Sequence, residues 1–328
     1  MNRNLFNPGR SRKQRMIRFV FMGVLLALPL IFNVPAEAKG FHGDNFCSAT
    51  AKVTKKSCYQ EMKADYYLAT GKCINLVDDE AREECLELAS EEWGLDDCKD
   101  QYAARQEICD ELGEGRYDPL IDKANFVDSS GEPLPIDNLF LPLIPGTIMT
   151  YEGGDETIVV TVTYDTVEIL EVPCTVVRDT VTDMENGELV EDTWDWFAQD
   201  VDGNVWYFGE LSMEYEDGEL VSLEGSWKAG EDGAKPGIVM LAHPEIADKM
   251  YRQEFLLGEA EDMAVVVDTG QNVDIDYGQY SDVLVTEEWT PVEPDVQENK
   301  YYAPDDGLIL EVNLENGESV ELIDISFF

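Results

Sequence analysis

The stretch DTWDWFAQDVDGNVWYFGE, residues 192–210, decides the fold of most of this chain. At its centre stands Asp202-Gly203, a dipeptide that favours a tight hairpin turn between two strands. On either side, aromatic and aliphatic residues alternate with polar ones, which is the period of a strand with two different faces. The stretch therefore predicts two antiparallel strands joined by a short turn.

The same pattern extends outward in both directions. Turn dipeptides recur at Asn186-Gly187, Asp217-Gly218 and Asn316-Gly317, again between alternating apolar runs. We expect about ten strands in an antiparallel meander that curls into an open barrel or a sandwich. The expected strands, some of them merged, lie near residues 148–152, 157–164, 167–182, 188–199, 204–216, 219–228, 250–257, 261–268, 281–289, 299–303, 307–314 and 318–325.

A helical module is expected before this β domain. Residues 47–112 contain no proline, and their glycines are Gly71 and Gly94. These glycines indicate breaks between three helices, at 45–70, 78–93 and 95–112. The aromatic residues of the module are expected to fill its small core; they are Tyr59, Tyr66, Tyr67, Trp93 and Tyr102.

Six of the seven cysteines fall in this module, which indicates the disulfide framework of an exported protein. Cys47 and Cys58 lie eleven positions apart, as do Cys98 and Cys109, and eleven residues make about three helical turns. Two such helices packed antiparallel would be joined at two levels. We therefore predict the pairs Cys47–Cys109, Cys58–Cys98 and Cys73–Cys85 among the 15 pairings that six cysteines allow.

The first 38 residues have the parts of an export signal. A basic lead from Arg3 to Arg18 precedes an apolar run from Phe19 to Val34 and the small-residue site Ala36-Glu37-Ala38. The run of about 16 residues is shorter than the ~20 that span a bilayer. We expect cleavage after Ala38 and a periplasmic or secreted protein without membrane insertion; an uncleaved anchor is the alternative.

The chain is thus expected to have an α+β architecture in four parts. These are a signal peptide over 1–38, a disulfide-linked three-helix module over 39–113, a proline-rich linker or wrapping segment over 114–145, and an antiparallel β domain over 146–328. The chain carries 69 acidic and 23 basic residues, a net charge of −46. Such a charge excludes nucleic acid and anionic lipid as partners and favours cations or basic partners.

The opening of the β domain, LPLIPGTIMTYEG at residues 141–153, also carries a resemblance to a known family. So do GSWKAGEDGAKPGIVM, YRQEFLLGEAEDMA and KYYAPDDGLI further along. The chain resembles uncharacterised exported bacterial proteins in which a PLxPGTxxxYEG segment opens a β domain behind a six-cysteine helical module. The resemblance implies that two-part architecture, and it implies neither a cofactor nor catalytic residues.

Nucleophilic chemistry has little support. The chain has two histidines, His42 and His243, and no G-x-S-x-G motif. Cys174 lies in a β-branched run of an acidic domain, so we expect a buried and inert thiol. We therefore name no catalytic residues and no cofactor.

Carboxylate chemistry has one candidate pair. Asp195 and Glu210 could meet across the hairpin, beside Trp196, Trp206 and Tyr207, as glycoside hydrolysis would require. The alternative is the usual strand pattern, in which the aromatic side chains form the core and the acids face water.

Arg178 and Arg252 stand out as rare bases inside strands. Each either closes an internal ion pair, Arg252 with Glu254, Glu259 or Glu261, or anchors a ligand carboxylate or phosphate. The ligand-binding candidates are therefore Arg178, Arg252, Trp196, Trp206 and Tyr207. Asp200, Asp202 and Asn204 form a weak calcium candidate that lacks the loop of an EF-hand, and a hairpin turn explains them equally.

Taken together, the sequence predicts an exported acidic binding or interaction protein for a small ligand or an envelope partner. Two alternatives stay open. One is a carboxylate-based hydrolase acting on an exported polymer, and the other is a calcium-responsive structural protein.

Overall fold

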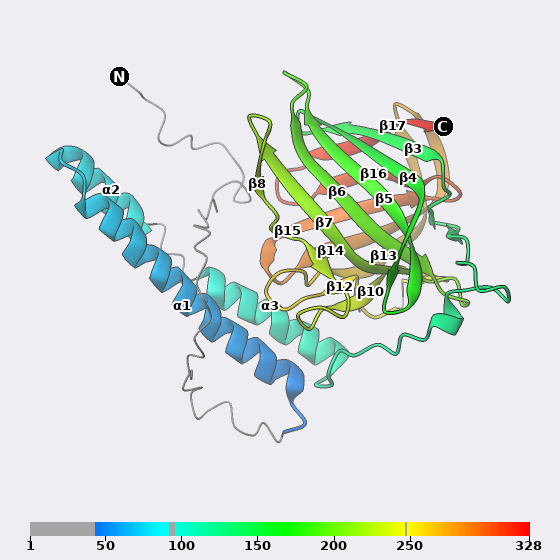
Figure 1. Cartoon of the computed structure of the whole chain (residues 1–328), viewed down its shortest axis with the longest axis horizontal. Coiled ribbons are helices and arrows are strands. Elements are labelled where there is room, and N and C mark those ends of the chain that lie inside the picture. Colours follow the sequence, from blue (N-terminus) through cyan, green and yellow to red (C-terminus); the bar gives the residue numbers. More distant parts are fainter. Residues whose placement is uncertain (1–42, 92–95, 247) are drawn as a thin grey trace, which may run out of the picture.

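The computed structural model describes residues 43–91, 96–246 and 248–328. It shows three helices and a large antiparallel β domain, which confirms the α+β class (Figure 1). The predicted signal peptide, His42 and Trp93 lie outside the described residues. No helix in the described part of the chain is both long and apolar enough to cross a membrane.

The helices are α1 (Phe46–Ile74), α2 (Asp79–Glu91) and α3 (Asp97–Leu112), close to the three that were predicted. The Asp78 carboxylate caps α2 by accepting a hydrogen bond of 2.8 Å from the backbone N–H of Ala81. In Figure 1, α1 and α2 form a hairpin that extends away from the β domain, and α3 lies between that hairpin and the sheet.

Three disulfides tie the helices together, and they are the pairs that the helical spacing favoured. Cys47–Cys109 and Cys58–Cys98 join α1 to α3, and Cys73–Cys85 joins α1 to α2. The prediction of an aromatic core was wrong. The Tyr67 side chain is 61% exposed, and the other described aromatic residues of the prediction are only partly buried.

Disulfides and mainly small or aliphatic side chains occupy the interior of this module instead. The Cα atoms of each disulfide pair lie 5.5–5.8 Å apart, and the buried residues include Ala51, Ala104 and Ile108.

The β domain is a 15-stranded antiparallel sheet, larger than the ten or so strands expected. Its strands are β3 (Thr147–Gly153), β4 (Glu156–Ile169), β5 (Val172–Asp183), β6 (Leu189–Gln199), β7 (Val205–Glu216), β8 (Glu219–Ser222), β9 (Trp227–Lys228), β10 (Lys235–Met240), β11 (Tyr251–Arg252), β12 (Glu254–Phe255), β13 (Met263–Ile275), β14 (Gly278–Thr290), β15 (Glu293–Ala303), β16 (Gly307–Asn313) and β17 (Ser319–Phe327).

The expected strand over 167–182 is instead the end of β4, a turn and β5. Leu170 and Glu171 form that turn with positive φ angles of 50° and 68°. Such backbone angles usually call for Asn or Gly in a two-residue hairpin. Leu170 and Glu171 have no such preference, so residues 167–182 predict a single strand where the structure has a turn.

The sheet closes on itself to form a nearly closed barrel (Figure 1). The first and last long strands meet, because β17 pairs with β3. On the opposite side, the segment of β11 and β12 pairs with β13 at one edge and with β10 at the other. Gly237 permits this closure, since a Cβ atom there would lie 2.4 Å from the carbonyl carbon of Gln253.

The expected linker wraps the barrel. It contains a short 3-10 helix, η3 (Lys123–Asn125), and a two-stranded sheet of β1 (Asp137–Asn138) and β2 (Leu141–Pro142). Ile136 and Leu143 from this segment belong to the main hydrophobic core. The Asn138 amide donates hydrogen bonds to the carbonyls of Gly203 and Leu241. The segment thus plugs one end of the barrel, here called the plugged end.

The other end of the barrel carries the turns at residues 154–155, 184–188, 217–218 and 314–318, and is called the hairpin end. Towards the plugged end, the interior is filled by buried apolar side chains such as Met149, Val162 and Val205. Towards the hairpin end, carboxylates enter the interior. The candidate functional site lies there.

Candidate functional site: an acid-lined barrel lumen

Strand register places three carboxylates on the inner wall of the barrel. Asp195 on β6 lies directly opposite Glu210 on β7 and opposite Val177 on β5. Residues directly opposite each other in neighbouring strands share a face of the sheet. Val177 belongs to the main core, so Asp195 and Glu210 face inward. Asp179, two residues after Val177, faces the same way.

Asp195 is held in an enclosed, acidic setting. Its Oδ1 atom accepts a hydrogen bond of 2.6 Å from the Tyr207 hydroxyl. Burial raises the pKa of Asp195 to about 8, and the nearby carboxylate of Glu210 adds to the increase. Tyr207 stacks on Phe197 at a centroid distance of 4.7 Å and meets the edge of Trp227 at 5.3 Å.

Asp179 is less well satisfied. Its buried Oδ1 atom has no hydrogen-bond partner among the described residues. Burial raises the pKa of Asp179 to about 8, with further contributions from Asp195, Glu191 and Glu311.

A charged network covers the facing wall. Lys300 on β15 lies 3.3 Å from Glu288 and 3.5 Å from Glu311. Glu288 also accepts hydrogen bonds of 2.8 Å from Thr286 and 3.0 Å from Tyr302. Although burial acts to lower the pKa of Lys300, these two carboxylates hold it well above its usual value. The lysine is thus ionised and already paired.

The edge at which the barrel closes adds another acid. Glu254 on β12 is 8% exposed, and burial raises its pKa well above the usual value, assisted by Asp262 and Glu210. Tyr251 on the adjoining strand β11 has a hydroxyl group without a hydrogen-bond partner among the described residues. Polar groups therefore continue around the barrel from β5 to β16.

Asp179, Asp195 and Glu311 are partly exposed, whereas Val162 and Leu322 of the same inner face are fully buried. No described Asp, Glu, His or Cys residues form a group of three or more that could hold a metal ion.

The five ligand-binding candidates do not come together. Tyr207 faces the lumen, but Arg178 lies on the outer face of β5 and forms a bidentate ion pair with Asp192, with distances of 2.8 and 2.9 Å. Arg178 also lies 5.4 Å from the ring centre of Trp194. The structure therefore gives Arg178 a cross-strand pair on the outer surface and not a ligand in the lumen.

Arg252 has a different environment from the ion pair that was expected. Its guanidinium lies 5.4 Å from the ring centre of Tyr117 and 4.9 Å from that of Phe255. Burial lowers its pKa, and the nearby Glu261 acts in the opposite direction. Glu261 forms its own ion pair with Arg105 of α3 at 2.6 Å. The sequence missed this pair because it joins two separate parts of the chain.

The outer tryptophans are covered by the wrapping segment. Trp196 and Trp206 lie on the outer faces of β6 and β7 and pack against a second hydrophobic cluster, in which Phe126 packs edge-on against Trp206. The expectation that aromatic residues face the core and acids face water is thus reversed for Trp196 and Asp195, whereas Phe197 packs against the main core. Cys174 is buried in this second cluster, and burial raises the pKa of its thiol.

The calcium candidate is a hairpin turn. The Asp200 carboxylate accepts hydrogen bonds from the backbone N–H groups of Asp202 and Asn204, from the Asn204 amide and from the Trp206 indole. Both of its oxygens are used in these bonds. The remaining histidine in the described part of the chain, His243, lies outside any strand.

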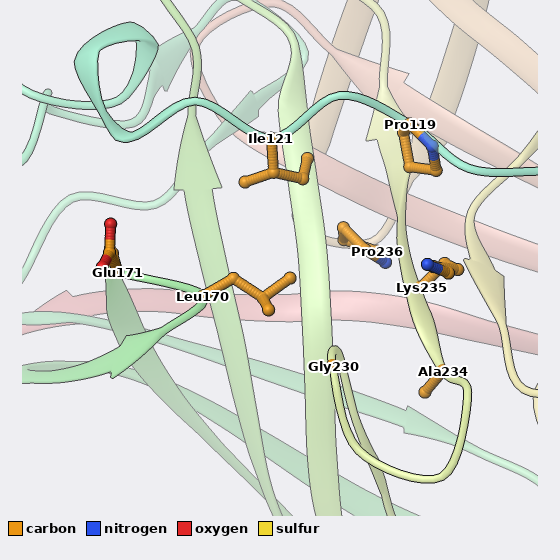
Figure 2. A pocket seen from close by; sticks show the side chains of 8 residues that line it. All are labelled: Pro119, Ile121, Leu170, Glu171, Gly230, Ala234, Lys235 and Pro236. Atoms are coloured by element: carbon orange, nitrogen blue, oxygen red, sulfur yellow. The ribbon is translucent and has the colours of Figure 1, made fainter.

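Two cavities lie outside the lumen. One of about 380 Å³ is bordered by Leu170, Ile121, Pro119 and Pro236, as Figure 2 shows. It sits beside the positive-φ turn between β4 and β5, and Glu171 and Lys235 also line it. The other, of about 570 Å³, lies between α3 and the outer wall of β13 to β15.

Sequence reasoning found Asp195, Glu210 and Tyr207 but missed Asp179 and Lys300. A signal for Asp179 was present, because the alternation Val177-Arg178-Asp179-Thr180-Val181 places it on the same face as two valines. Burying a carboxylate on an otherwise apolar strand face costs free energy, so such a residue indicates a specific role.

Comparison with known proteins leaves the family open. No family model matches the chain, and no curated protein matches it. Among solved structures, the chain is similar to a candidate lipoprotein from Parabacteroides distasonis ATCC 8503, with a TM-score of 0.29 and 10% identity. That similarity covers 58% of this chain and 99% of the other.

Proposed function

We propose that this chain is an extracytoplasmic binding protein that holds a small ligand in the acid-lined part of its barrel. Three disulfides in a small helical module support an oxidising compartment. The predicted signal peptide agrees with that location. On the same grounds we place the chain with the exported bacterial proteins that its PLxPGTxxxYEG segment resembles.

One observation carries the binding proposal. Asp179, Asp195 and Glu311 enter the barrel interior among buried apolar side chains, and all three are partly exposed. Leaving carboxylates enclosed without full pairing costs stability. Apolar residues at these positions would make the folded state more stable. The enclosed carboxylates therefore favour a role in ligand binding.

The test is a variant that fills the lumen. Val181 lies on the inner face of β5, opposite Ile158, and Val181→Trp would occupy the acidic half. Thr180→Trp, on the outer face of the same strand, is the matched control. Native mass spectrometry of the exported protein should show a bound small molecule in the wild type and in Thr180→Trp, and none in Val181→Trp. Equal occupancy in all three variants, or no bound molecule in any, would contradict the proposal.

A second candidate function is supported by the pair Asp195 and Glu210. A protonated acid beside a second carboxylate is the arrangement used for glycoside hydrolysis. Burial keeps Asp195 protonated at neutral pH, because its pKa is about 8. The hydrolase would act on an exported polymer. If Asp195→Asn and Glu210→Gln both still release sugars from a polymer, these two residues are not the catalytic acids and the hydrolase candidate is contradicted.

A further inference from the structure

The helix α1 carries an uncharged stripe whose residues have the spacing of a helix–helix contact. Seven exposed positions follow one another alternately four and three residues apart, and they are Val53, Ser57, Gln60, Ala64, Tyr67, Gly71 and Ile74. Residues spaced in this way lie along one side of a helix and form the seam of a coiled coil. Lysines and acidic residues occur elsewhere on α1, but none falls on this α1 stripe.

The α1 stripe faces away from the rest of the molecule. The opposite side of α1 carries the three cysteines whose disulfides join it to α2 and α3. In Figure 1, α3 lies between α1 and the barrel. Val53, Tyr67 and Ile74 on the stripe are 63%, 61% and 63% exposed. A row of exposed apolar side chains along one helix face is typical of a surface that contacts another protein.

The glycine of the stripe has no structural reason within this chain. Gly71 lies inside α1, which continues to Ile74, although glycine disfavours a helix interior. Its φ angle is not positive, and a Cβ atom at this position would meet nothing within 4 Å. Close approach of a second helix supplies the reason, because a glycine leaves room for a large side chain of a facing helix.

The charges beside the middle of the stripe are complementary to those of a second copy. Lys56 and Lys63 lie along one edge of the stripe, and Glu61 and Asp65 lie along the other, all of them exposed. A parallel copy of α1 would set the lysine edge of each helix against the acidic edge of the other. An antiparallel copy would instead bring Lys63 to Lys63 and Glu61 to Glu61, which is unfavourable.

We propose that α1 pairs in parallel with α1 of a second copy of this chain, along the α1 stripe. Tyr67 of each copy then packs beside Ala64 and Gly71 of the other, and Lys63 lies beside Glu61. The two acidic barrels lie on opposite sides of the paired helices, separated by more than the ~8 Å over which physiological salt screens charge. Because disulfides already hold α1 in place, little conformational freedom is lost on association. The dimer does not depend on ligand binding in the barrel.

The test measures the mass of the full, disulfide-linked protein in solution. Sedimentation equilibrium over about 1–100 μM should show a reversible dimer. Ala64→Glu places a charge in the contact and should abolish the dimer. Ala81→Glu, at an exposed position of α2, is the matched control and should leave it unchanged. Since both positions are exposed, circular dichroism should show the same helix content in the two variants and the wild type.

Charge variants test the parallel orientation. Lys63→Glu sets an acid against Glu61 of the second copy and should weaken dimerisation by about tenfold. The double variant Lys63→Glu, Glu61→Lys exchanges the two edges and should restore it. Gly71→Leu fills space that is open in the single chain. It should therefore weaken the dimer without lowering the melting temperature of the monomer.

Several outcomes would overturn the inference. A wild type that stays monomeric over the whole concentration range overturns it, and so does a dimer that persists in Ala64→Glu. If Lys63→Glu dimerises as tightly as the wild type does, the parallel orientation is wrong. A monomeric wild type that binds vesicles of phosphatidylglycerol and phosphatidylcholine, with loss of binding in Ala64→Glu, would assign the α1 stripe to a membrane surface instead.

Discussion

Arg105 of α3 and Glu261, between β12 and β13, form a buried ion pair that joins the helical module to the barrel. Their side chains are 6% and 2% exposed, and the closest approach is 2.6 Å between Nη2 and Oε1. Arg105 Nε also lies 3.1 Å from both carboxylate oxygens. Close to it, Gly258 donates its N–H to Glu261.

Truncating one partner of this pair should strongly destabilise the docked helices. Arg105→Ala removes the ion-pair partner of the buried Glu261 carboxylate, a change that costs about 3–5 kcal/mol. Denaturant unfolding and limited proteolysis should show the helical module separating from the barrel first. Lys249→Ala, which removes an exposed partner of Glu111, is the control and should have little effect. Equal effects of the two variants would contradict this role.

The enclosed acids should make the barrel less stable as the pH rises. The pKa of Asp195 is about 8 in the folded chain and near 3.8 when exposed, so the folded state binds a proton that the unfolded state releases. Stability is therefore greatest below about pH 4 for this group and falls up to about pH 8, by at most about 1.4 kcal/mol per pH unit.

Asp195→Asn isolates that contribution, because an amide does not titrate and its oxygen can still accept from Tyr207. Chemical unfolding between pH 5 and pH 8 should show the variant gaining stability relative to the wild type as the pH rises. Asp324→Asn, on the outer face, is the control. A difference between Asp195→Asn and the wild type that stays constant across this range would show that Asp195 is ionised in the folded protein.

The hairpin turn at Asp200 should be sensitive to loss of its carboxylate. Asp200→Ala removes the acceptor for Asp202, Asn204 and Trp206, and leaves the indole N–H unpaired beneath the wrapping segment. We expect a loss of about 2–3 kcal/mol in unfolding free energy. Asp202→Ala in the same turn should cost much less. If added calcium stabilises the wild type but not Asp200→Ala, the turn binds the ion after all.

Barrel closure should depend on Gly237. A Cβ atom at this position would lie 2.4 Å from the carbonyl carbon of Gln253 and 2.5 Å from the carbonyl oxygen of Arg252. Gly237→Ala must therefore push β12 away from β10, with an expected loss of about 3 kcal/mol or more. Gly115→Ala has open space around it and serves as the control. An unchanged melting temperature for Gly237→Ala would contradict the closure seen here.

Reduction of the three disulfides should unfold the helical module and leave the barrel folded. The Cys58–Cys98 bond closes a sequence separation of 40 residues, which corresponds to about 4 kcal/mol of chain entropy. The barrel contains the free thiol Cys174 and no disulfide among its described residues. Reductant should therefore remove helical circular dichroism and leave the near-ultraviolet signal of Trp206. Parallel loss of both signals would show that the barrel needs the helices.

Local chemistry was enough to predict much of this fold. The turns at Asp202-Gly203 and Asn316-Gly317 follow from backbone preferences of single residues, whereas the break predicted at Gly71 is wrong, because α1 continues to Ile74. The turn at Leu170 and Glu171 could not be found in this way, because tertiary packing holds two unfavourable residues at positive φ.

The candidate site was harder to predict than the fold. Alternation along β6 separates Asp195 from Trp196, but it does not tell which face becomes the lumen. The wrapping segment decides this by placing Phe126 over the outer aromatic face at Trp206. Because the wrapping segment covers this apolar face from outside, the opposite face of the strand, which carries the carboxylates, forms the interior of the barrel.

The pairing of β17 with β3 has a consequence for how the protein is made. Its two strands are separated by almost the whole β domain, so the barrel cannot be completed until β17 is available. A chain that crosses a membrane from its N-terminus would carry an open β3 edge throughout its passage. Glu152 and, on its eventual partner, Glu321 and Asp324 place negative charge along these edges, and charge is a common defence of an unpaired strand against aggregation.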